Sequence, residues 1–431
     1  MTAFSAPKGT FDVLPEDSGA WEATVTSLLE PAQRAGYRLV RTPVFEDTGV
    51  FLRVGESTDV VTKEMYTFAD KGDRSVTLRP EGTAGVVRAA IEHHVDRGAL
   101  PWKVRYAGEM FRYERPQAGR TRQFFQVGIE ALGLDDPAID AEVVTLGVRA
   151  FEEAGLPNVT LLLNSMGDEA CRPAYIETLR GYLRANDASL CGECRGRAET
   201  NPLRALDCKR ADCQAVLGAA PVITDHLCVP CKEHYGEVRS YLSALGVAWT
   251  EAPRLVRGLD YYRRTTFEYQ HTGLGAQNAV GGGGRYDGLS ESLGGPALPG
   301  IGWALGVERV LLALRAEGVE VPLPPVAEVF VIPVGTATRA DAVRLVDELR
   351  SAGTRADMAY GGKGLKGALK AADRSGAYAV LIVGDGGVTL KHMDTGEQED
   401  VPLAEAAARA AAAAARDERA GIRTDPEDAD A

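Results

Sequence analysis

One stretch of the sequence decides the fold: WKVRYAGEMFRYERPQAGRTRQFFQVGIEALG, residues 102–133. Two long runs with the alternation of β-strands flank a short polar loop, residues 114–120. Strands joined by so short a connection pair in the antiparallel direction. The pattern therefore predicts a sheet that is at least partly antiparallel.

The second run of this hairpin has two chemically different faces. Its apolar side chains alternate with polar ones, so one face is a hydrophobic layer and the other carries Gln126, Gly128 and Glu130. Arg112, in the first run, falls on the same polar face. This face suits a ligand, although a solvated sheet face would show the same alternation.

Outward from the hairpin, helix and strand patterns alternate. We expect a helix over residues 18–35, kinked or ended by Pro31, strands over 39–45, 75–78 and 254–270, helices over 83–94 and 302–315, and a glycine loop at 281–284. Residues 165–252 differ, because they are helical in pattern and rich in cysteine. We interpret them as an insertion.

A proline-containing segment, GVEVPLPPVAEV, marks a linker at residues 318–329. The βαβαβ pattern and hairpin after it predict a small domain with parallel strands. The fold class is therefore α/β, with an α+β domain built on an antiparallel sheet. We place this larger domain at 1–325, interrupted by 165–252, the α/β domain at 326–403, and an Ala-rich helix with an acidic, disordered tail at 404–431.

Composition narrows the class of protein. The 431 residues carry a net charge of -13, which argues against a general nucleic-acid coat protein but allows local basic faces. The first residues do not resemble a secretion signal, and no apolar run is long enough to span a bilayer. We expect a cytoplasmic protein that does not bind membranes.

Several separated motifs resemble the class II aminoacyl-tRNA synthetases. They are GTFDVLPED and RTPVFE (9–17 and 41–46), FRYERPQAGRTRQFFQVGIEALG (111–133) and GIGWALGVERVLLAL (300–314). Three further stretches resemble the histidyl-tRNA synthetase family within that class: TLRPEGTAG (77–85), RLVRGLDYYRRTTFEY (254–269) and GGGGRYDGL (281–289). The likeness runs over nearly the whole chain, and motifs in this order are far more specific than any one of them.

The resemblance implies a two-step reaction. Histidine and ATP form histidyl-adenylate and pyrophosphate, and a terminal ribose hydroxyl of tRNA then takes the histidyl group. By resemblance, Arg112 and Arg257 hold the α-phosphate and are the catalytic residues, while Arg309 binds the γ-phosphate. ATP is thus a substrate, bound also by Glu114, with Mg²⁺ as the expected cofactor. Arg257 could instead form a structural ion pair, for example with Asp260.

The resemblance also implies a histidine pocket. Neutral imidazole offers one donor and one acceptor, which a carboxylate and a phenol can both recognise. The implied residues are Glu130 and Tyr262 at the imidazole, Glu81, Thr83 and Gln126 at the amino and carboxylate ends, Tyr261 completing the pocket, and Arg112 and Arg257 beside the substrate. The two tyrosines could instead be core residues.

For tRNA, we expect two contact regions. The Arg-rich hairpin loop carries Arg115 and Gln117, our candidates for the acceptor end. A later helix carries a basic stripe at i, i+3/i+4 spacing, formed by Lys363, Lys366, Lys370 and Arg374. We assign Lys366 and Lys370 to tRNA, because the domain resembles the family's anticodon-binding domain; a solvated helix face is the alternative.

Six of the seven cysteines lie between residues 191 and 231. The pairs Cys191/Cys194 and Cys228/Cys231 could form a tetrahedral structural zinc site. Zinc is not a general feature of the family, so reduced thiols are the alternative that we favour. Cys171 fits a small buried apolar side chain.

The family also implies a homodimer. A competing hypothesis is a catalytically silent relative that senses histidine and regulates its biosynthesis. Such relatives typically lack the C-terminal domain and the RGLDYY motif, and this chain has both.

Overall fold

The computed structural model describes residues 4–53, 55, 60–275, 278–321, 323–362 and 364–421. The chain forms two compact units, Met1–Pro322 and Leu323–Ala431. Among the described residues, no helix has both the length and the apolar character needed to cross a membrane.

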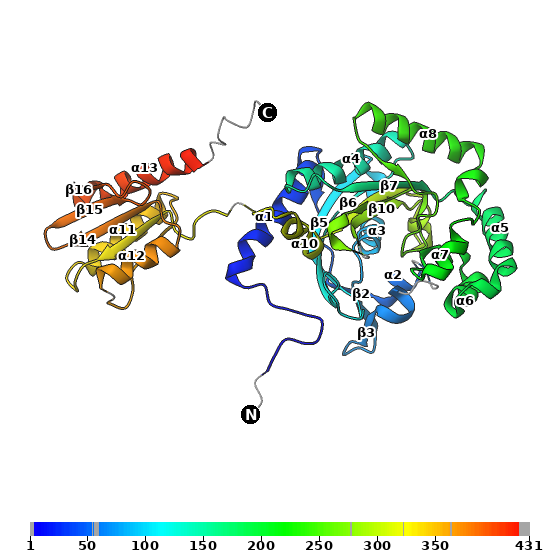
Figure 1. Cartoon of the computed structure of the whole chain (residues 1–431), viewed down its shortest axis with the longest axis horizontal. Coiled ribbons are helices and arrows are strands. Elements are labelled where there is room, and N and C mark those ends of the chain that lie inside the picture. Colours follow the sequence, from blue (N-terminus) through cyan, green and yellow to red (C-terminus); the bar gives the residue numbers. More distant parts are fainter. Residues whose placement is uncertain are drawn as a thin grey trace. The chain divides into compact units, whose positions relative to one another are not determined.

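The first unit is built on an eight-stranded sheet (Figure 1). Its order is β1 (Arg38–Leu39), β5 (Trp102–Phe111), β6 (Gln123–Leu132), β11 (Gly300–Gly306), β10 (Ala279–Arg285), β9 (Arg263–Gln270), β7 (Thr160–Ser165) and β8 (Thr250–Glu251). The six inner strands are antiparallel, and only the short edge strands β1 and β8 pair in parallel. The expected antiparallel hairpin is confirmed.

The two faces of this sheet have different coverings. One face packs its apolar side chains against α1 (Pro15–Arg34), α4 (Pro137–Glu153), α8 (Val229–Ala244) and α10 (Val307–Glu317). The other face meets α3 (Thr83–Glu92), α9 (Leu289–Ser292) and several tyrosines. Val127 and Ile129 of β6 face the first layer, so Gln126 and Glu130 face the second, as the alternation predicts.

Smaller elements complete the unit. A three-stranded antiparallel sheet consists of β2 (Phe45–Asp47), β4 (Ser75–Leu78) and β3 (Tyr66–Ala69), beside α2 (Thr48–Leu52). The insertion holds α5 (Arg172–Ala185), α6 (Gly192–Thr200) and α7 (Ala211–Leu217) around a hydrophobic cluster of its own, and α8, which packs on the large sheet. Short helical turns are η1 (Val60–Glu64), η2 (Val95–Arg97), η3 (Asp187–Ser189), η4 (Pro202–Asp207), η5 (Ile223–His226) and η6 (Thr272–Leu274).

The second unit is a five-stranded sheet with the expected βαβαβ start. The order is β13 (Ala356–Met358), β12 (Val329–Pro333), β14 (Ala379–Gly384), β15 (Gly387–His392) and β16 (Gln398–Val401), the first three parallel and the last two antiparallel. Helices α11 (Arg339–Ser351) and α13 (Leu403–Gly421) pack on one face, and α12 (Leu365–Arg374) packs on the other. The acidic tail, 422–431, lies outside the described residues.

Several expectations about local structure were wrong in part. The first helix is confirmed as α1, but Pro31 does not end it: the helix continues to Arg34, with Leu28, Leu29 and Ala32 around the proline buried in the core. The expected strand over 39–45 is split, since the chain leaves β1 and joins the small sheet at β2. The expected strand over 254–270 begins only at Arg263, after an irregular loop.

The expected helix over 302–315 begins at Val307, because residues 300–306 pair with β6 and β10 as the central strand β11.

Candidate active site

A cleft of about 530 Å³ lies on the second face of the large sheet. This volume is within the usual range for small-molecule sites. Its walls come from the β5–β6 hairpin, strands β10 and β11, the start of α3, the irregular loop 256–262 and the insertion. The predicted site residues that line it are Glu81, Thr83, Arg112, Glu114, Gln126, Arg257, Tyr261, Tyr262 and Arg309.

Glu81 and Thr83 lie at the beginning of α3. The Glu81 carboxylate accepts hydrogen bonds from the backbone N–H groups of Thr83 (2.7 Å) and Ala84 (2.8 Å), which are free donors of the first helical turn. Burial raises the pKa of Glu81. The helix start therefore holds this carboxyl group rigidly at the cleft wall.

Glu130 lies fully buried beneath the cleft rather than on its surface. Its Oε1 accepts from the hydroxyls of Thr83 (2.7 Å) and Tyr106 (3.3 Å), and its Oε2 accepts from Tyr286 (2.6 Å). A carboxylate has about four acceptor positions, so roughly one is left for a ligand. Burial raises the pKa of Glu130 to about 8.

Aromatic rings surround this acid. The Tyr261 ring lies 4.7 Å from that of Tyr262 and 5.8 Å from that of Tyr286, measured between centroids. Burial raises the pKa of Tyr262 to about 12, so its hydroxyl stays protonated. Tyr261 also packs in the hydrophobic cluster below the cleft, as the core alternative expected. Both tyrosines nonetheless line the cleft.

Five arginines line the cleft, and three of them, Arg112, Arg257 and Arg309, were predicted from the sequence. Arg112 donates from Nε to the Pro80 carbonyl (2.9 Å), and its guanidinium lies 5.3 Å from the centre of the Phe124 ring. Arg309 donates from Nη1 to the Gly119 carbonyl (3.3 Å), so the hairpin loop and α10 meet at this side chain. These cationic groups make the cleft suitable for a polyanion such as a triphosphate.

Arg257 forms an ion pair with Glu268, not with Asp260. Asp260 instead accepts from the Asn201 side-chain amide at 3.3 Å. Within the described part of the chain, the buried Arg257 Nε has no hydrogen-bond partner. The same is true of Gln126 Oε1, so two polar atoms of the predicted site are unsatisfied.

The four glycines 281–284 lie in the inner strand β10 (Ala279–Arg285), so the expected glycine loop was wrong. A Cβ on Gly282 would meet the Arg257 guanidinium at 2.9 Å, and one on Gly284 would meet the Tyr262 ring at 2.8 Å. These glycines make room for the two predicted site residues at the cleft. Neighbouring strands hold them on both sides, which excludes a flexible loop.

The tip of the hairpin carries Arg115 and Gln117, which are exposed and do not line the cleft. Gln117 pairs through its backbone with Arg120. Glu114, at the base of the loop, lines the cleft and lies 3.2 Å from Arg120 and 3.9 Å from Arg112.

Several residues at the cleft escaped the sequence prediction. Arg204, Asp207 and Lys209 reach it from the insertion, and no periodicity connects that segment with the sheet. Others are the partners of predicted residues: Tyr106, Glu268 and Tyr286. Glu268 and Tyr286 lie inside the motifs quoted above, and that membership was the signal that could have found them.

The cysteines require a correction. The two CxxC pairs do not meet: Cys191 and Cys194 gather with Cys208 and Cys213, while Cys228 and Cys231 gather with Cys171 and Asp168. The pairs separate because each opens a different helix, α6 or α8, and these helices begin in different parts of the fold. The predicted four-cysteine zinc site is therefore wrong as a ligand set.

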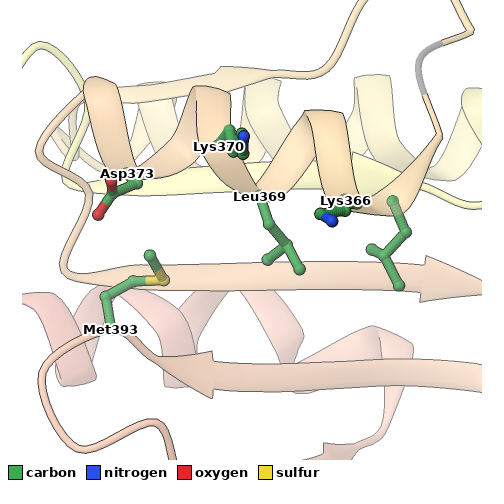
Figure 2. A pocket seen from close by; sticks show the side chains of 6 residues that line it. Lys366, Leu369, Lys370, Asp373 and Met393 are labelled. Carbon is green, nitrogen blue, oxygen red and sulfur yellow. The ribbon is translucent and has the colours of Figure 1, made fainter.

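In the second unit, a groove runs beside α12 (Figure 2). Lys366 and Lys370 are exposed on the helix and line the groove with Leu365, Leu369, Asp373 and Met393. Arg374, the last residue of α12, is also exposed. Lys363, the first member of the expected basic stripe, lies outside the described residues.

An antiparallel sheet with an arginine-lined cleft, joined to a separate α/β domain, agrees with the motifs that resemble the class II aminoacyl-tRNA synthetases. A family profile described as "Histidyl-tRNA synthetase" matches residues 9–310, and one described as "Anticodon binding domain" matches residues 328–412. The chain belongs to the histidyl-tRNA synthetase family.

Individual relatives agree with this assignment. The chain is 55% identical to the histidine–tRNA ligase of Rhodococcus erythropolis, over 93% of this chain and 96% of that protein. It is 54% identical to that of Saccharopolyspora erythraea, over 95% and 98%. Among solved structures, apo histidyl-tRNA synthetase from S. aureus has a TM-score of 0.80 at 39% identity, covering 95% of this chain and all of that one.

Proposed function

We propose that this cleft activates L-histidine with ATP to histidyl-adenylate and pyrophosphate, and then transfers histidine to the 3′ end of its tRNA. One observation carries the proposal: the three predicted arginines line the same cleft as Thr83 and Tyr106, whose hydroxyls donate to the buried Glu130 carboxyl group. The arginines suit ATP, and the carboxyl group with its tyrosines suits an imidazole.

The first step needs alignment more than proton transfer. The carboxylate of histidine is already ionised at neutral pH, so it attacks the α-phosphate without a protein base. Negative charge grows on the phosphate oxygens, and the bidentate donors of Arg112 and Arg257 neutralise it. Arg309, which the hairpin loop and α10 hold in place, binds the γ-phosphate.

The part of the cleft beside Arg112 also suits a Mg²⁺ ion. The ion prefers carboxylate and phosphate oxygens, and Glu114 offers a carboxylate at the cleft beside Arg112. When bound, the ion would supply further neutralisation of the phosphates. Glu114 would therefore contribute to ATP binding indirectly, by holding the Mg²⁺ ion.

Histidine selection rests on Glu130 and Tyr262. In its ionised form Glu130 accepts from the imidazole N–H at its remaining position, and the Tyr262 hydroxyl pairs with the other ring nitrogen. A side chain without these groups would leave both partners buried and unpaired, which costs a site such as this much of its affinity. Glu81, Thr83 and Gln126, whose Oε1 is unsatisfied, then hold the amino and carboxylate ends of histidine.

Binding of tRNA uses surfaces outside the cleft. Arg115 and Gln117 at the exposed hairpin tip meet the acceptor end, and Lys366 and Lys370 on α12 meet the anticodon region. The match of residues 328–412 to an anticodon-binding domain supports the second contact. It also disfavours the silent regulatory relative, which typically lacks that domain.

The test is ATP–pyrophosphate exchange with each standard amino acid offered separately. Exchange with histidine alone, followed by charging of histidine tRNA, is the expected result. Folded protein that binds histidine but exchanges no amino acid in the presence of Mg²⁺ would overturn the proposal and favour the regulatory relative. The proposed setting is the cytoplasm, and the proposed assembly is a homodimer, which sedimentation analysis would test.

A further inference from the structure

All seven cysteines of the chain belong to one of two compact groups. Group A contains Cys191, Cys194, Cys208 and Cys213, and group B contains Asp168, Cys171, Cys228 and Cys231. Within each group, the sulfur or carboxylate ligand atoms all lie within 4.8 Å of one another. No disulfide joins any of these cysteines.

Group B has the spacing of a tetrahedral metal site. A zinc ion with Zn–S bonds of about 2.3 Å places its sulfur ligands about 3.8 Å apart. The sulfur atoms of Cys171 and Cys231 are 3.9 Å apart. Asp168 Oδ1 lies 3.5 Å from the Cys171 sulfur and 3.7 Å from that of Cys228. The fourth ligand is thus an oxygen already facing the thiols.

Group A has backbone donors directed at its sulfur atoms. The Cys194 N–H donates to the Cys191 sulfur (3.4 Å), and the Cys191 N–H donates to the Cys213 sulfur (3.2 Å). Such donors stabilise a thiolate, which is the form that binds metal. The CxxC pair at the start of α6 supplies two ligands, and the segment from η4 to α7 supplies the other two.

The alternative is that the cysteines only fill space as small apolar side chains. A carboxylate among three thiols is a poor apolar neighbour, which disfavours this alternative for group B. In both groups one cysteine, Cys191 or Cys228, is only half-buried yet still gathers with the rest. We propose that each group binds one zinc ion, in a Cys₄ site and an AspCys₃ site.

The two ions would brace the insertion against the cleft. Group B joins residue 168, just beyond β7 at the beginning of the insertion, to the start of α8, the last helix of the insertion. Next to Cys171, Arg172 donates to the backbone carbonyls of Met166 (3.0 Å) and Tyr262. Loss of this ion would therefore loosen the loop that carries Tyr262.

Group A supports a second contact with the same loop. Arg204, four residues before Cys208, donates to the Asp207 carboxylate and to the Arg257 carbonyl, both at 3.0 Å. The proposed sites are thus structural and take no part in the chemistry. This inference does not rest on the proposed function, because metal content is measured without any assay of aminoacylation.

The first experiment measures metal in the full-length protein, purified without a metal-binding tag and dialysed against metal-free buffer. Elemental analysis by mass spectrometry should find about two zinc ions per chain. Cys191→Ser and Cys228→Ser change the least buried cysteine of each group and should each lose about one ion. Glu169→Gln, beside Asp168, and Leu190→Ala, beside Cys191, are the matched controls and should keep both.

A second measurement protects the test against variants that fail to fold. A mercurial reagent added to the unmodified protein should displace zinc as the thiols react, with release followed by a chromogenic indicator. Folded protein with a negligible zinc content and seven titratable thiols would overturn the proposal, as would iron in place of zinc or an intramolecular disulfide. One ion, lost in only one of the two variants, would overturn the assignment of the other group.

Discussion

Arg257 shows how one residue combines several constraints. Its guanidinium pairs with Glu268, its carbonyl accepts from Arg204, and Gly282 leaves room for the side chain at the cleft wall. An arginine held in this way keeps its guanidinium N–H groups in one fixed orientation at the cleft. This arrangement suits the stabilisation of charge that appears only in the transition state.

Arg257→Ala should lower kcat for histidine-dependent pyrophosphate exchange by about 10²–10³-fold, because fixed donors to the developing charge are lost. Arg257→Lys should recover only part of the rate, since an ammonium group lacks the planar fork. Arg239→Ala, in an exposed ion pair with Glu251, is the control and should leave the rate unchanged. Exchange at the normal rate in Arg257→Ala would refute the catalytic assignment.

Glu130 should make stability depend on pH. Its pKa rises from an ordinary value of 4.5 to about 8, so the folded chain holds a proton that the unfolded chain loses between these values. Stability should therefore fall as pH rises from about 5 to about 8, by on the order of a few kcal/mol.

Glu130→Gln removes this titration. Its melting temperature, compared with that of the unmodified protein, should become relatively higher as pH rises from 5 to 9. Thermal melts across this range without ligand would measure the trend. A difference between the two proteins that does not change with pH would show that Glu130 titrates normally.

At the scale of elements, strand β10 is the tightest part of the site. A Cβ on Gly282 would lie 2.7 Å from the Phe267 carbonyl and 2.9 Å from the Arg257 guanidinium. Gly282→Ala should destabilise the fold by about 1–3 kcal/mol through overpacking. Because Arg257 must move, the exchange rate should also fall.

Gly181→Ala is the matched control for this substitution. Gly181 lies in α5 with open space where a Cβ would go, so alanine should stabilise the protein by about 0.5–1 kcal/mol. Urea unfolding and exchange kinetics of both variants give the comparison. Equal behaviour of the two would mean that β10 tolerates side chains and that the glycines have another role.

Helix α12 has its own test. Lys366→Glu combined with Lys370→Glu should weaken tRNA binding about tenfold or more, since each reversal places a negative charge near phosphates. Amino-acid activation should not change. Arg344→Glu, on α11 at the opposite face of the same sheet, is the control. Filter binding at fixed salt measures the effect, and equal losses from both variants would deny α12 a special role.

At the scale of the whole molecule, the two units have separate cores. The first unit contains the sheet, the cleft and the insertion, while the second has its own hydrophobic clusters on both faces of its sheet. This division suggests that activation and anticodon contact belong to different units.

A chain limited to the first unit, Met1–Pro322, should therefore keep histidine-dependent pyrophosphate exchange and lose most of its affinity for tRNA. Circular dichroism would first establish that the shortened chain is folded. Exchange and charging assays would then separate the two activities. Loss of exchange in a folded fragment would show that the second unit is needed for the first step.

Local pattern was enough for much of this molecule. The hairpin of β5 and β6, the two faces of β6 and the βαβαβ start of the second unit all follow from periodicity, and the structure confirms them. These features depend on residues near each other along the chain. The motifs also identified the family, because so many motifs in the order typical of that family leave few other families that could match.

Only the tertiary structure decided which distant residues meet. It pairs Arg257 with Glu268 and brings three hydroxyl groups to the Glu130 carboxyl group. It also places the four glycines in an inner strand and divides the cysteines into two groups. Each outcome depends on strand pairing or helix packing between segments far apart along the chain. Such pairing has no signature in the local pattern, because it is determined by the packing of the whole core.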